Sequence, residues 1–438
     1  MIIRFRARNF RSLKDEQELS LVASSLKDAP EAVTQIEGLD LGLVRVAAIY
    51  GANASGKSNV IKALAYMSSA VQNSQRLWAP EGPIPREPFL LDPQSKVDPS
   101  SFEVDLLLEG VRFHYGFTLN DKKILEEWLD AYPTGNKPVR KQMWFKREGK
   151  AFTFGNKMSG DNSAIERLTR PNSLFLSAAA QNNHRALMPL YGWFAENVAL
   201  VPKEREPLLL KTAEMCREEA LKSWVLNALR SADLGVVGLA VREVDLFGRS
   251  READATEQRG VDVADALRNL AATFKKREGF RGPRHTVDLI HKGAQQEVTL
   301  RRHNESEGTM AFLGLLGPVL KAIKSGGTIC VDELDESLHP LLGLEIVRLF
   351  NDPELNPRSA QIIFTTHDTN ILDKASLRRD QIWFTEKDSE GATHLYPLTD
   401  FKPRKNENLE RGYLQGRYGA VPFVGSSDFL AIPDKAEH

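Results

Sequence analysis

Residues 51–58 read Gly-Ala-Asn-Ala-Ser-Gly-Lys-Ser and fit the phosphate-binding pattern G-x-x-x-x-G-K-[ST] at every specified position. In such a loop, backbone N–H groups and the positive end of the following helix point at the phosphates of a nucleotide. We expect Lys57 to hold the β- and γ-phosphates and to act in catalysis, and Ser58 to bind Mg²⁺. The other expected nucleotide contacts from this stretch are Asn53, Ala54, Ser55, Gly56 and Asn59.

Two adjacent carboxylates follow a second apolar run. Residues 328–331, Thr-Ile-Cys-Val, predict a buried strand that ends at Asp332 and Glu333. Mg²⁺ prefers oxygen ligands and keeps several waters, so we expect Asp332 to share the metal with Ser58. Glu333 lies one residue further out, where a carboxylate could polarise the attacking water. The two motifs together predict a site for ATP and Mg²⁺.

A histidine follows a third apolar run, in Phe-Thr-Thr-His-Asp at 364–368. If this strand lies in the same sheet as Asp332, His367 sits at the carboxyl edge beside the γ-phosphate. A lone histidine is more often an ordinary surface or core residue. Its position at a strand end favours a catalytic role for His367.

A helix N-terminus precedes the acidic strand, at Glu-Ser-Glu-Gly-Thr-Met, residues 305–310. Ser306 is a good N-cap, Gly308 allows close approach by a ligand, and Thr309 can donate a hydrogen bond. The segment could be a capped helix and nothing more. A helix N-terminus is also an anion site, so we include Ser306, Gly308 and Thr309 among the expected nucleotide contacts.

The elements that must position these residues can be read from hydrophobic periodicity. Residues 43–50 predict a buried strand before the loop, and apolar positions after Ser58 predict a helix. Residues 1–10 predict an edge strand, and 101–119 and 143–154 predict hairpins. Residues 172–230 look helical, and 248–283 look like exposed helix and a mobile loop. From Gly308 onward, strands alternate with helices, which indicates a parallel α/β sheet.

This pattern predicts an α/β fold of three parts. We expect an N-terminal ATPase lobe at 1–165, a mainly helical insertion returning through strands at 166–300, and a C-terminal ATPase lobe at 301–438.

Lys and Arg total 58 against 59 Asp and Glu, so no global basic field indicates nucleic acid. No apolar run is long enough to span a bilayer and no signal peptide is evident. Two cysteines in separate contexts favour reduced thiols, and we expect a cytoplasmic protein.

The order of the motifs resembles the ATPase head of ABC-type proteins, with a strand-rich N-terminal lobe and a parallel-sheet C-terminal lobe. The phosphate loop, residues 306–309, the acidic pair, Ser-Leu-His-Pro at 337–340 and His367 resemble its phosphate loop, signature, Walker B acids, D-loop and switch histidine. Asn53 and Ser-Asn-Val at 58–60 resemble SMC and RecF heads more than transporters. Segments 171–177, 379–384 and 413–422 resemble bacterial AAA15/Rlo-type ATPases over nearly the whole chain.

The resemblance implies a head-to-tail dimer, possibly extended to a larger assembly, in which the signature serine of one chain acts on the γ-phosphate held by the other. It also implies a partner, a separate small nuclease-like or toxin-like effector, in phage-defence or abortive-infection systems. The signature reads Ser-Glu-Gly-Thr rather than the Ser-Gly-Gly form of transporters. The glutamine that normally senses Mg²⁺ is not obvious; Gln181 is a candidate nucleotide and metal contact, and a polar residue that starts a helix is the alternative.

Other functions remain open at this point. One is a repair or recombination ATPase of RecF or SMC type that acts directly on DNA, although no long coiled coil is visible. Another is a scaffold that binds ATP with almost no hydrolysis. A transporter ATPase is disfavoured by the long insertion between loop and signature. Two basic groups leave contact with DNA or RNA open: Arg4, Arg6, Arg8 and Arg11, and Lys275, Lys276, Arg277, Arg281 and Arg284.

Overall fold

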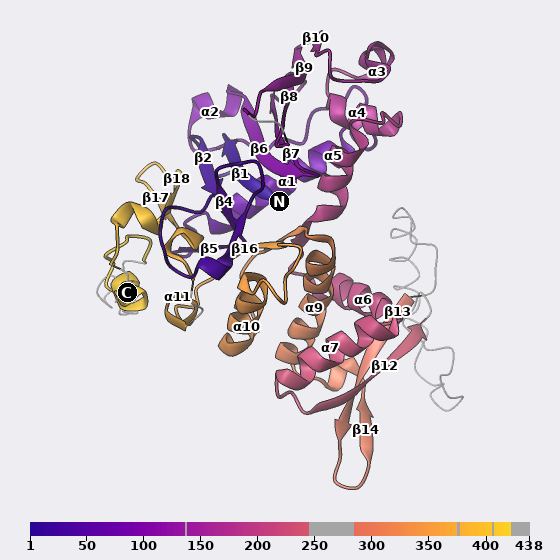
Figure 1. The fold of residues 1–438 in the computed structure, drawn as a ribbon, viewed down its shortest axis with the longest axis vertical. Helices are drawn as coiled ribbons and strands as arrows, with labels where there is room; N and C mark the ends of the chain where they lie inside the picture. The colour runs from indigo at the N-terminus through magenta and orange to yellow at the C-terminus, as the bar shows by residue number, and fades with distance from the viewer. Residues whose placement is uncertain (136–137, 245–283, 375–376, 405–406, 422–438) are drawn as a thin grey trace, which may run out of the picture. The chain divides into compact units, whose positions relative to one another are not determined.

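The computed structural model describes residues 1–135, 138–244, 284–374, 377–404 and 407–421 (Figure 1). The stretch expected at 248–283, most of the second basic group, and Pro422 lie outside the described residues. Contacts group the chain into two units. The first comprises Met1–Leu200, Ile323–Asp335 and Gly343–His438, and the second comprises Val201–Ala322 and Glu336–Leu342. The three ranges expected from the sequence stay a prediction, and 166–200 groups with the first unit.

The first unit contains an antiparallel sheet of seven strands in the order β10-β9-β8-β7-β6-β1-β2. Its strands are β1 (Ile2–Arg8), β2 (Gln17–Ser20), β6 (Ser100–Leu108), β7 (Val111–Leu119), β8 (Ile124–Pro133), β9 (Gln142–Glu148) and β10 (Ala151–Phe154). Both expected hairpins are confirmed, since β6 pairs with β7 and β9 with β10. Glu109 and Gly110 both have positive φ, as a tight two-residue hairpin turn requires.

The prediction that the N-terminal strand lies at an edge is wrong. Strand β1 is flanked by β6 on one side and β2 on the other. Its basic residues alternate with buried apolar ones, but carboxylates on both neighbours meet them. Arg6 forms ion pairs with Glu18 of β2 and Glu103 of β6. The row of charges in the sequence indicated an exposed edge strand. In the structure, ion pairs to the neighbouring strands allow this charged strand to lie inside the sheet.

The second sheet of this unit carries the strand ends expected to form the site. Its order is β11-β15-β16-β5-β17-β18, with β11 (Val198–Val201), β15 (Thr328–Val331), β16 (Gln361–Thr365), β5 (Val46–Gly51), β17 (Ile382–Lys387) and β18 (Thr393–Pro397). Strands β15, β16, β5 and β17 are parallel neighbours in that order, and β18 runs antiparallel to β17. The expected parallel α/β sheet is therefore confirmed. A short pair, β3 (Val33–Gln35) and β4 (Gly42–Val44), precedes β5.

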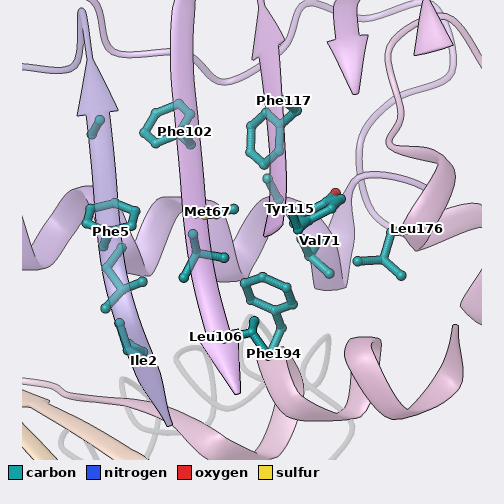
Figure 2. Packing of buried hydrophobic residues seen from close by; sticks show 14 of the residues in the cluster. Ile2, Phe5, Met67, Val71, Phe102, Leu106, Tyr115, Phe117, Leu176 and Phe194 are labelled. Carbon is teal, nitrogen blue, oxygen red and sulfur yellow. The ribbon is translucent and has the colours of Figure 1, made fainter. Parts of the chain in front are cut away.

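Helix α1 (Lys57–Asn73) packs against strands of both sheets, namely β1 and β6 of one and β5 and β16 of the other. Figure 2 shows Met67 and Val71 beneath the aromatic side chains of Phe102 and Phe117, with Phe5 to one side. These side chains belong to one buried cluster that also includes Ile49 and Ile363 of the parallel sheet. Burial of this apolar surface fixes the helix, and hence the phosphate loop at its N-terminus, relative to the strand ends.

Several further helices complete the first unit: α2 (Pro93–Val97), α3 (Asn162–Leu168), α4 (Phe175–Gln181), α5 (Met188–Gly192), α11 (Asn370–Lys374) and α12 (Leu409–Leu414). Helix α10 (Pro340–Asn351) begins in the second unit and continues into the first. The expected helical stretch 172–230 is thus largely helical, with strand β11 inside it.

Cys330, on β15, and Cys216 are buried free thiols, and burial raises their pKa values to about 12 and about 11.

The second unit contains a three-stranded antiparallel sheet in the order β12-β13-β14: β12 (Val236–Val244), β13 (Arg284–Lys292) and β14 (Glu297–Leu300). Helix α6 (Arg205–Met215) packs on β13, and α7 (Glu219–Ser231) packs on β12. Most of α9 (Glu307–Ser325) belongs here, and the α6 residue Thr212 donates to the Gly314 carbonyl at 3.2 Å. None of the described helices is long and apolar enough to cross a membrane.

Candidate functional site

The phosphate loop follows a strand that is buried along its whole length, β5, and leads directly into α1. A Cβ on Gly51 would lie 2.5 Å from Ser55 Oγ and from the Thr385 carbonyl, so only glycine fits there. Gly56 has φ +103°, and a Cβ on it would lie 2.1 Å from Thr393 Oγ1. Both glycines of the pattern are therefore required by the tight turn itself.

The lysine of the loop is buried, and its ammonium contacts the loop backbone. Lys57 Nζ donates to the carbonyls of Gly51 and Ala52, at 2.8 and 3.0 Å. Burial lowers the pKa of Lys57, and the carboxylates of Glu333, Asp332 and Asp335 act against that shift. The loop thus holds a cation next to the expected acidic pair.

The metal-binding residues expected from the sequence lie together. Ser58 Oγ donates to Asp332 Oδ1 at 2.7 Å, although 274 positions separate them in the chain. A hydroxyl and a carboxylate side by side suit Mg²⁺, which prefers oxygen ligands and retains waters and phosphate oxygens in the rest of its shell. No group of three or more His, Cys, Asp or Glu residues forms a metal cage within the described part of the chain. A metal held by few protein ligands fits this arrangement.

A threonine that sequence reasoning left out of the site connects both acidic residues. Thr365 is the last residue of β16 and is fully buried. Its Oγ1 donates to Asp332 Oδ1 at 2.8 Å and accepts from the Glu333 N–H at 2.7 Å. Glu333 has φ +59°, in the left-handed region that a glutamate rarely adopts. The contact with Thr365 helps to hold this strained backbone in place.

The histidine lies at the same edge of the sheet. Thr366 N donates to the Ile49 carbonyl at 3.2 Å, which fixes the end of β16 next to β5. His367 N donates to Asp335 Oδ2 at 3.2 Å. Partial withdrawal from water lowers the pKa of His367, and the nearby Lys57 ammonium lowers it further. The structure therefore brings His367 to the side of Lys57 and the acidic pair.

Asp335 is a second residue that sequence reasoning missed. It stands three positions after Asp332, and its carboxylate accepts the backbone N–H of His367. The signal in the sequence is the third acid of Asp-Glu-Leu-Asp. Acids in a turn are too common for that spacing alone to indicate a role.

Other expected contacts from the loop have varied surroundings. Asn53 and Ala54 are exposed, and Ala54 has φ +62°. Ser55 is buried, with its Oγ 2.7 Å from Thr385 Oγ1. Asn59 Nδ2 donates to Ser12 Oγ at 2.6 Å, which ties α1 to the turn after β1. Asn53 and Ala54 thus face solvent, while Ser55 and Asn59 also hold the loop in shape.

The candidate Gln181 lies on α4. Helix α4, which Gln181 ends, begins beside the far end of α1, where Gln75 N donates to Ser177 Oγ at 3.1 Å. Ser58 lies in the first turn of α1, and a 17-residue helix is about 25 Å long. Its expected role as a nucleotide and metal contact stays a prediction.

The residues expected as the signature form the start of α9, in the second unit. Ser306 is exposed, and its Oγ accepts from the Thr309 N–H at 3.1 Å, as an N-cap does. Thr309 is buried, and a Cβ on Gly308 would lie 3.1 Å from the Ser337 carbonyl. Arg205, at the start of α6, donates to Ser337 Oγ at 2.6 Å and to the Glu307 carbonyl at 3.3 Å. One guanidinium therefore links the expected signature to the expected D-loop.

The basic row near the N-terminus is largely neutralised. Besides Arg6, Arg4 lies 3.8 Å from Glu18, and Arg11 forms a 2.7 Å ion pair with Glu87. Arg8 is exposed. Paired arginines are less available to phosphates of nucleic acid.

A phosphate loop that follows a buried strand, with two carboxylates and a histidine at the ends of neighbouring parallel strands, is the arrangement of an ATPase of the ABC head class. The chain belongs to the family described as "AAA domain, putative AbiEii toxin, Type IV TA system", whose match spans residues 46–373. The resemblance to ABC-like ATPases of abortive-infection systems is thereby confirmed. No match is found among curated proteins.

Two solved structures are similar over most of their length. One is an SMC head bound to the C-winged helix domain of ScpA, 11% identical, covering 90% of this chain and 96% of that one with a TM-score of 0.39. The other is an Smc head with an extended coiled coil bound to the C-terminal domain of ScpA from Pyrococcus furiosus, 14% identical, covering 91% and 97% with a TM-score of 0.32. At these values neither likeness bears on what this chain binds.

Proposed function

We propose that this chain hydrolyses ATP in a head-to-tail dimer and acts as a switch on a separate effector in anti-phage defence. The observation that carries the ATPase is the joining of Ser58, Asp332 and Thr365 at one sheet edge within 2.8 Å. Membership of a family described by a toxin and a type IV TA system supports a role beside a partner protein. The proposed effector is a small nuclease-like or toxin-like protein.

In the proposed reaction, Lys57 holds the β- and γ-phosphates and His367 contacts the γ-phosphate. Ser58 and Asp332 are the residues that would hold Mg²⁺, which when bound neutralises charge on the phosphate oxygens. Glu333 accepts a proton from the water that attacks the γ-phosphorus, and ADP leaves with the bridging oxygen. Asn53, Ala54, Ser55, Gly56 and Asn59 supply or shape the loop around the phosphates.

In the proposed dimer, each chain contacts the nucleotide of the other chain through the start of its α9. Ser306 is exposed at a helix N-terminus, where a partner's γ-phosphate would be stabilised by the helix dipole and by Gly308 and Thr309. We infer that ATP bridges the two copies, and that its hydrolysis opens them again. Closure would remodel residues 185–300 and so present or withhold the effector.

Substitution of Glu333 tests the ATPase. Glu333→Gln removes the base and keeps the shape, so ATP binding should persist while turnover falls by about a hundredfold or more. Measurements are ATP affinity by fluorescent-analogue titration and phosphate release. Glu336→Gln is the matched control, because Glu336 is an exposed acid of the same turn, next to Lys203. Parental turnover in Glu333→Gln would refute the assignment of Glu333.

Dimerisation and the effector are tested separately. Glu333→Gln with ATP should sediment as a dimer, and Lys57→Ala, which loses nucleotide binding, should stay monomeric under the same conditions. Affinity capture of the Glu333→Gln protein with ATP should retain the product of an adjacent small nuclease or toxin gene. A dimer that forms equally without ATP would contradict the switch.

A further inference from the structure

The C-terminal segment 407–421 contacts both the phosphate loop and the loop that carries His367. It contains helix α12 and the aromatic residues Tyr413 and Tyr418, which are 5% and 1% exposed. All of these contacts lie within the first unit. Because the two tyrosines are buried in the chain's own fold, they cannot act as an exposed docking surface for a partner.

One side of the segment packs on the strand that leads into the phosphate loop. The Tyr413 ring lies edge-on to Tyr50, with centroids 5.7 Å apart, and stacks on Phe384 of β17 at 5.6 Å. Tyr50 is the residue immediately before Gly51. Burial raises the pKa of Tyr413, and a hydrogen bond with the Gly51 backbone acts against that shift. The helix thus touches the first residue of the phosphate loop.

The other side of the segment reaches the residues that follow His367. Thr369 Oγ1 donates to Glu410 Oε1 at 2.6 Å. Tyr50 connects the two contacts, because its hydroxyl donates to the Asp368 carbonyl at 3.2 Å. Asp368 Oδ1 in turn accepts from Asn370 N at 2.9 Å at the start of α11. Through these contacts, Glu410, Tyr413 and Tyr50 connect the loop that carries His367 to the phosphate loop.

Contacts within the segment and with Phe384 hold it in this position. A Cβ on Gly412 would lie 2.7 Å from the Tyr418 hydroxyl, so the helix can approach the ring only with glycine there. The Tyr418 ring stacks on Phe384 at 5.8 Å, and its hydroxyl donates to Glu407 at 2.9 Å. The Tyr413 hydroxyl donates to the Ala420 carbonyl at 3.2 Å. These contacts fold 407–421 back on itself and fix α12 against the sheet.

We propose that 407–421 is an intramolecular brace that sets the position of His367 relative to the phosphate loop, with Glu410 as a positioning residue for the reaction. The proposal rests on the proposed ATPase and adds a part of the chain that the ATPase motifs leave unused. Glu410 contacts Thr369, and in the proposal it acts through Thr369 and the loop before it. Loss of its hydrogen bond frees that loop.

The test compares Glu410→Ala with Leu414→Ala, a 62% exposed position on the same short helix. Glu410→Ala should lower kcat by about tenfold, with ATP affinity within about twofold of the parent, because a small displacement of a reacting group costs rate rather than binding. On a His367→Ala background the same substitution should have no further effect on kcat. Leu414→Ala should match the parent. An equal loss in both backgrounds would contradict action through His367.

A second readout does not depend on turnover. Hydrogen–deuterium exchange of nucleotide-free protein should show faster exchange of the amides of 367–371 in Glu410→Ala than in the parent or in Leu414→Ala. Unchanged exchange overturns the brace, whatever the activities. If the parent and Glu410→Ala both lack ATPase activity while exchange differs, the brace stands and the proposed reaction fails. If the parent hydrolyses ATP and exchange is unchanged, the reaction stands and the brace fails.

Discussion

Thr365 Oγ1 donates to Asp332 Oδ1 at 2.8 Å across the boundary between two parallel strands. The same oxygen accepts the N–H of Glu333 at 2.7 Å. Because a backbone N–H can only donate, the Thr365 hydroxyl is the acceptor in this bond and the donor in the bond to Asp332. One buried hydroxyl therefore orients the proposed metal ligand and the proposed base together. The register of β15 against β16, which pairs Val331 with Phe364, produces this contact.

We predict that Thr365→Val will lower turnover by about tenfold or more and unfolding free energy by about 1–3 kcal/mol. Valine keeps the volume and removes the hydroxyl, which takes an acceptor from the partly buried Glu333 N–H. ATP affinity should change little, because Lys57 and the loop are untouched. Phosphate release and urea denaturation provide the two measurements.

Thr365→Ser is the matched comparison, since it keeps the hydroxyl and loses a methyl group. It should recover most of the turnover while it still costs some stability through the small cavity. If the serine and valine variants lose turnover equally, the contribution of Thr365 is packing and the hydrogen bonds do not matter to the reaction.

The sequence predicted the phosphate loop, the acidic strand end, the position of His367 after a strand, and a parallel sheet, because buried strands and a glycine-bearing loop have strong local signals. Thr365 and Asp335 were missed since each acts through a partner more than 30 positions away or through a backbone N–H. Nothing local distinguishes a threonine that ends a strand from one that orients an acid. The proximity of Ser58 to Asp332 could be predicted only because the phosphate-loop pattern and the acidic strand end were both assigned to one nucleotide site.

Another difference has the same cause. The N-terminal strand was expected at an edge because its arginines looked solvated, and the carboxylates that meet Arg6 come from residues 18 and 103. The packing of α4 beside the end of α1 likewise depends on tertiary contacts such as Ser177 with Gln75. Pairing across distant segments is not encoded in a short window of sequence.

We predict that His367 titrates below its ordinary pKa of 6.5 and that Lys57→Met raises this pKa. Partial burial and the Lys57 cation both disfavour the imidazolium, so the folded chain binds this proton less readily than the unfolded chain. The contribution of His367 to stability is accordingly complete above pH 6.5 and declines as the pH falls toward its lowered pKa. Histidine-selective NMR titration of the two proteins measures both values. A midpoint at or above 6.5 in the parent would contradict the shift.

We predict that Arg6→Gln lowers the unfolding free energy by about 1 kcal/mol without weakening any binding to DNA or RNA. Arg6 is partly buried between Glu18 and Glu103, which raise its pKa against the effect of burial. Arg8→Gln is the matched control, since Arg8 is the exposed end of the same strand. Urea denaturation and salt-dependent polarisation with labelled duplex give the readouts. A shallower salt dependence in Arg6→Gln would instead place this row in a nucleic-acid site.

The last prediction concerns Arg205, whose guanidinium joins Ser337 Oγ at 2.6 Å to the Glu307 carbonyl at 3.3 Å. Ser337 has φ +63°, so its backbone is held in an unfavourable region next to the start of α9. In the proposed dimer these two segments face the other copy. On the Glu333→Gln background, Arg205→Ala should weaken ATP-dependent dimerisation by about tenfold, while ATP binding to Lys57 and its loop is retained.

Arg205→Lys should behave almost like Arg205→Ala, because an ammonium cannot reproduce the two divergent hydrogen bonds of the planar guanidinium. Arg217→Ala is the matched control, since Arg217 is an exposed arginine paired with Glu214 in the same unit. Sedimentation velocity across a range of protein concentrations, with ATP present, gives the dimer constant for each variant. Equal constants for the Arg205 and Arg217 variants would show that the link between the signature and the D-loop does not shape the dimer surface.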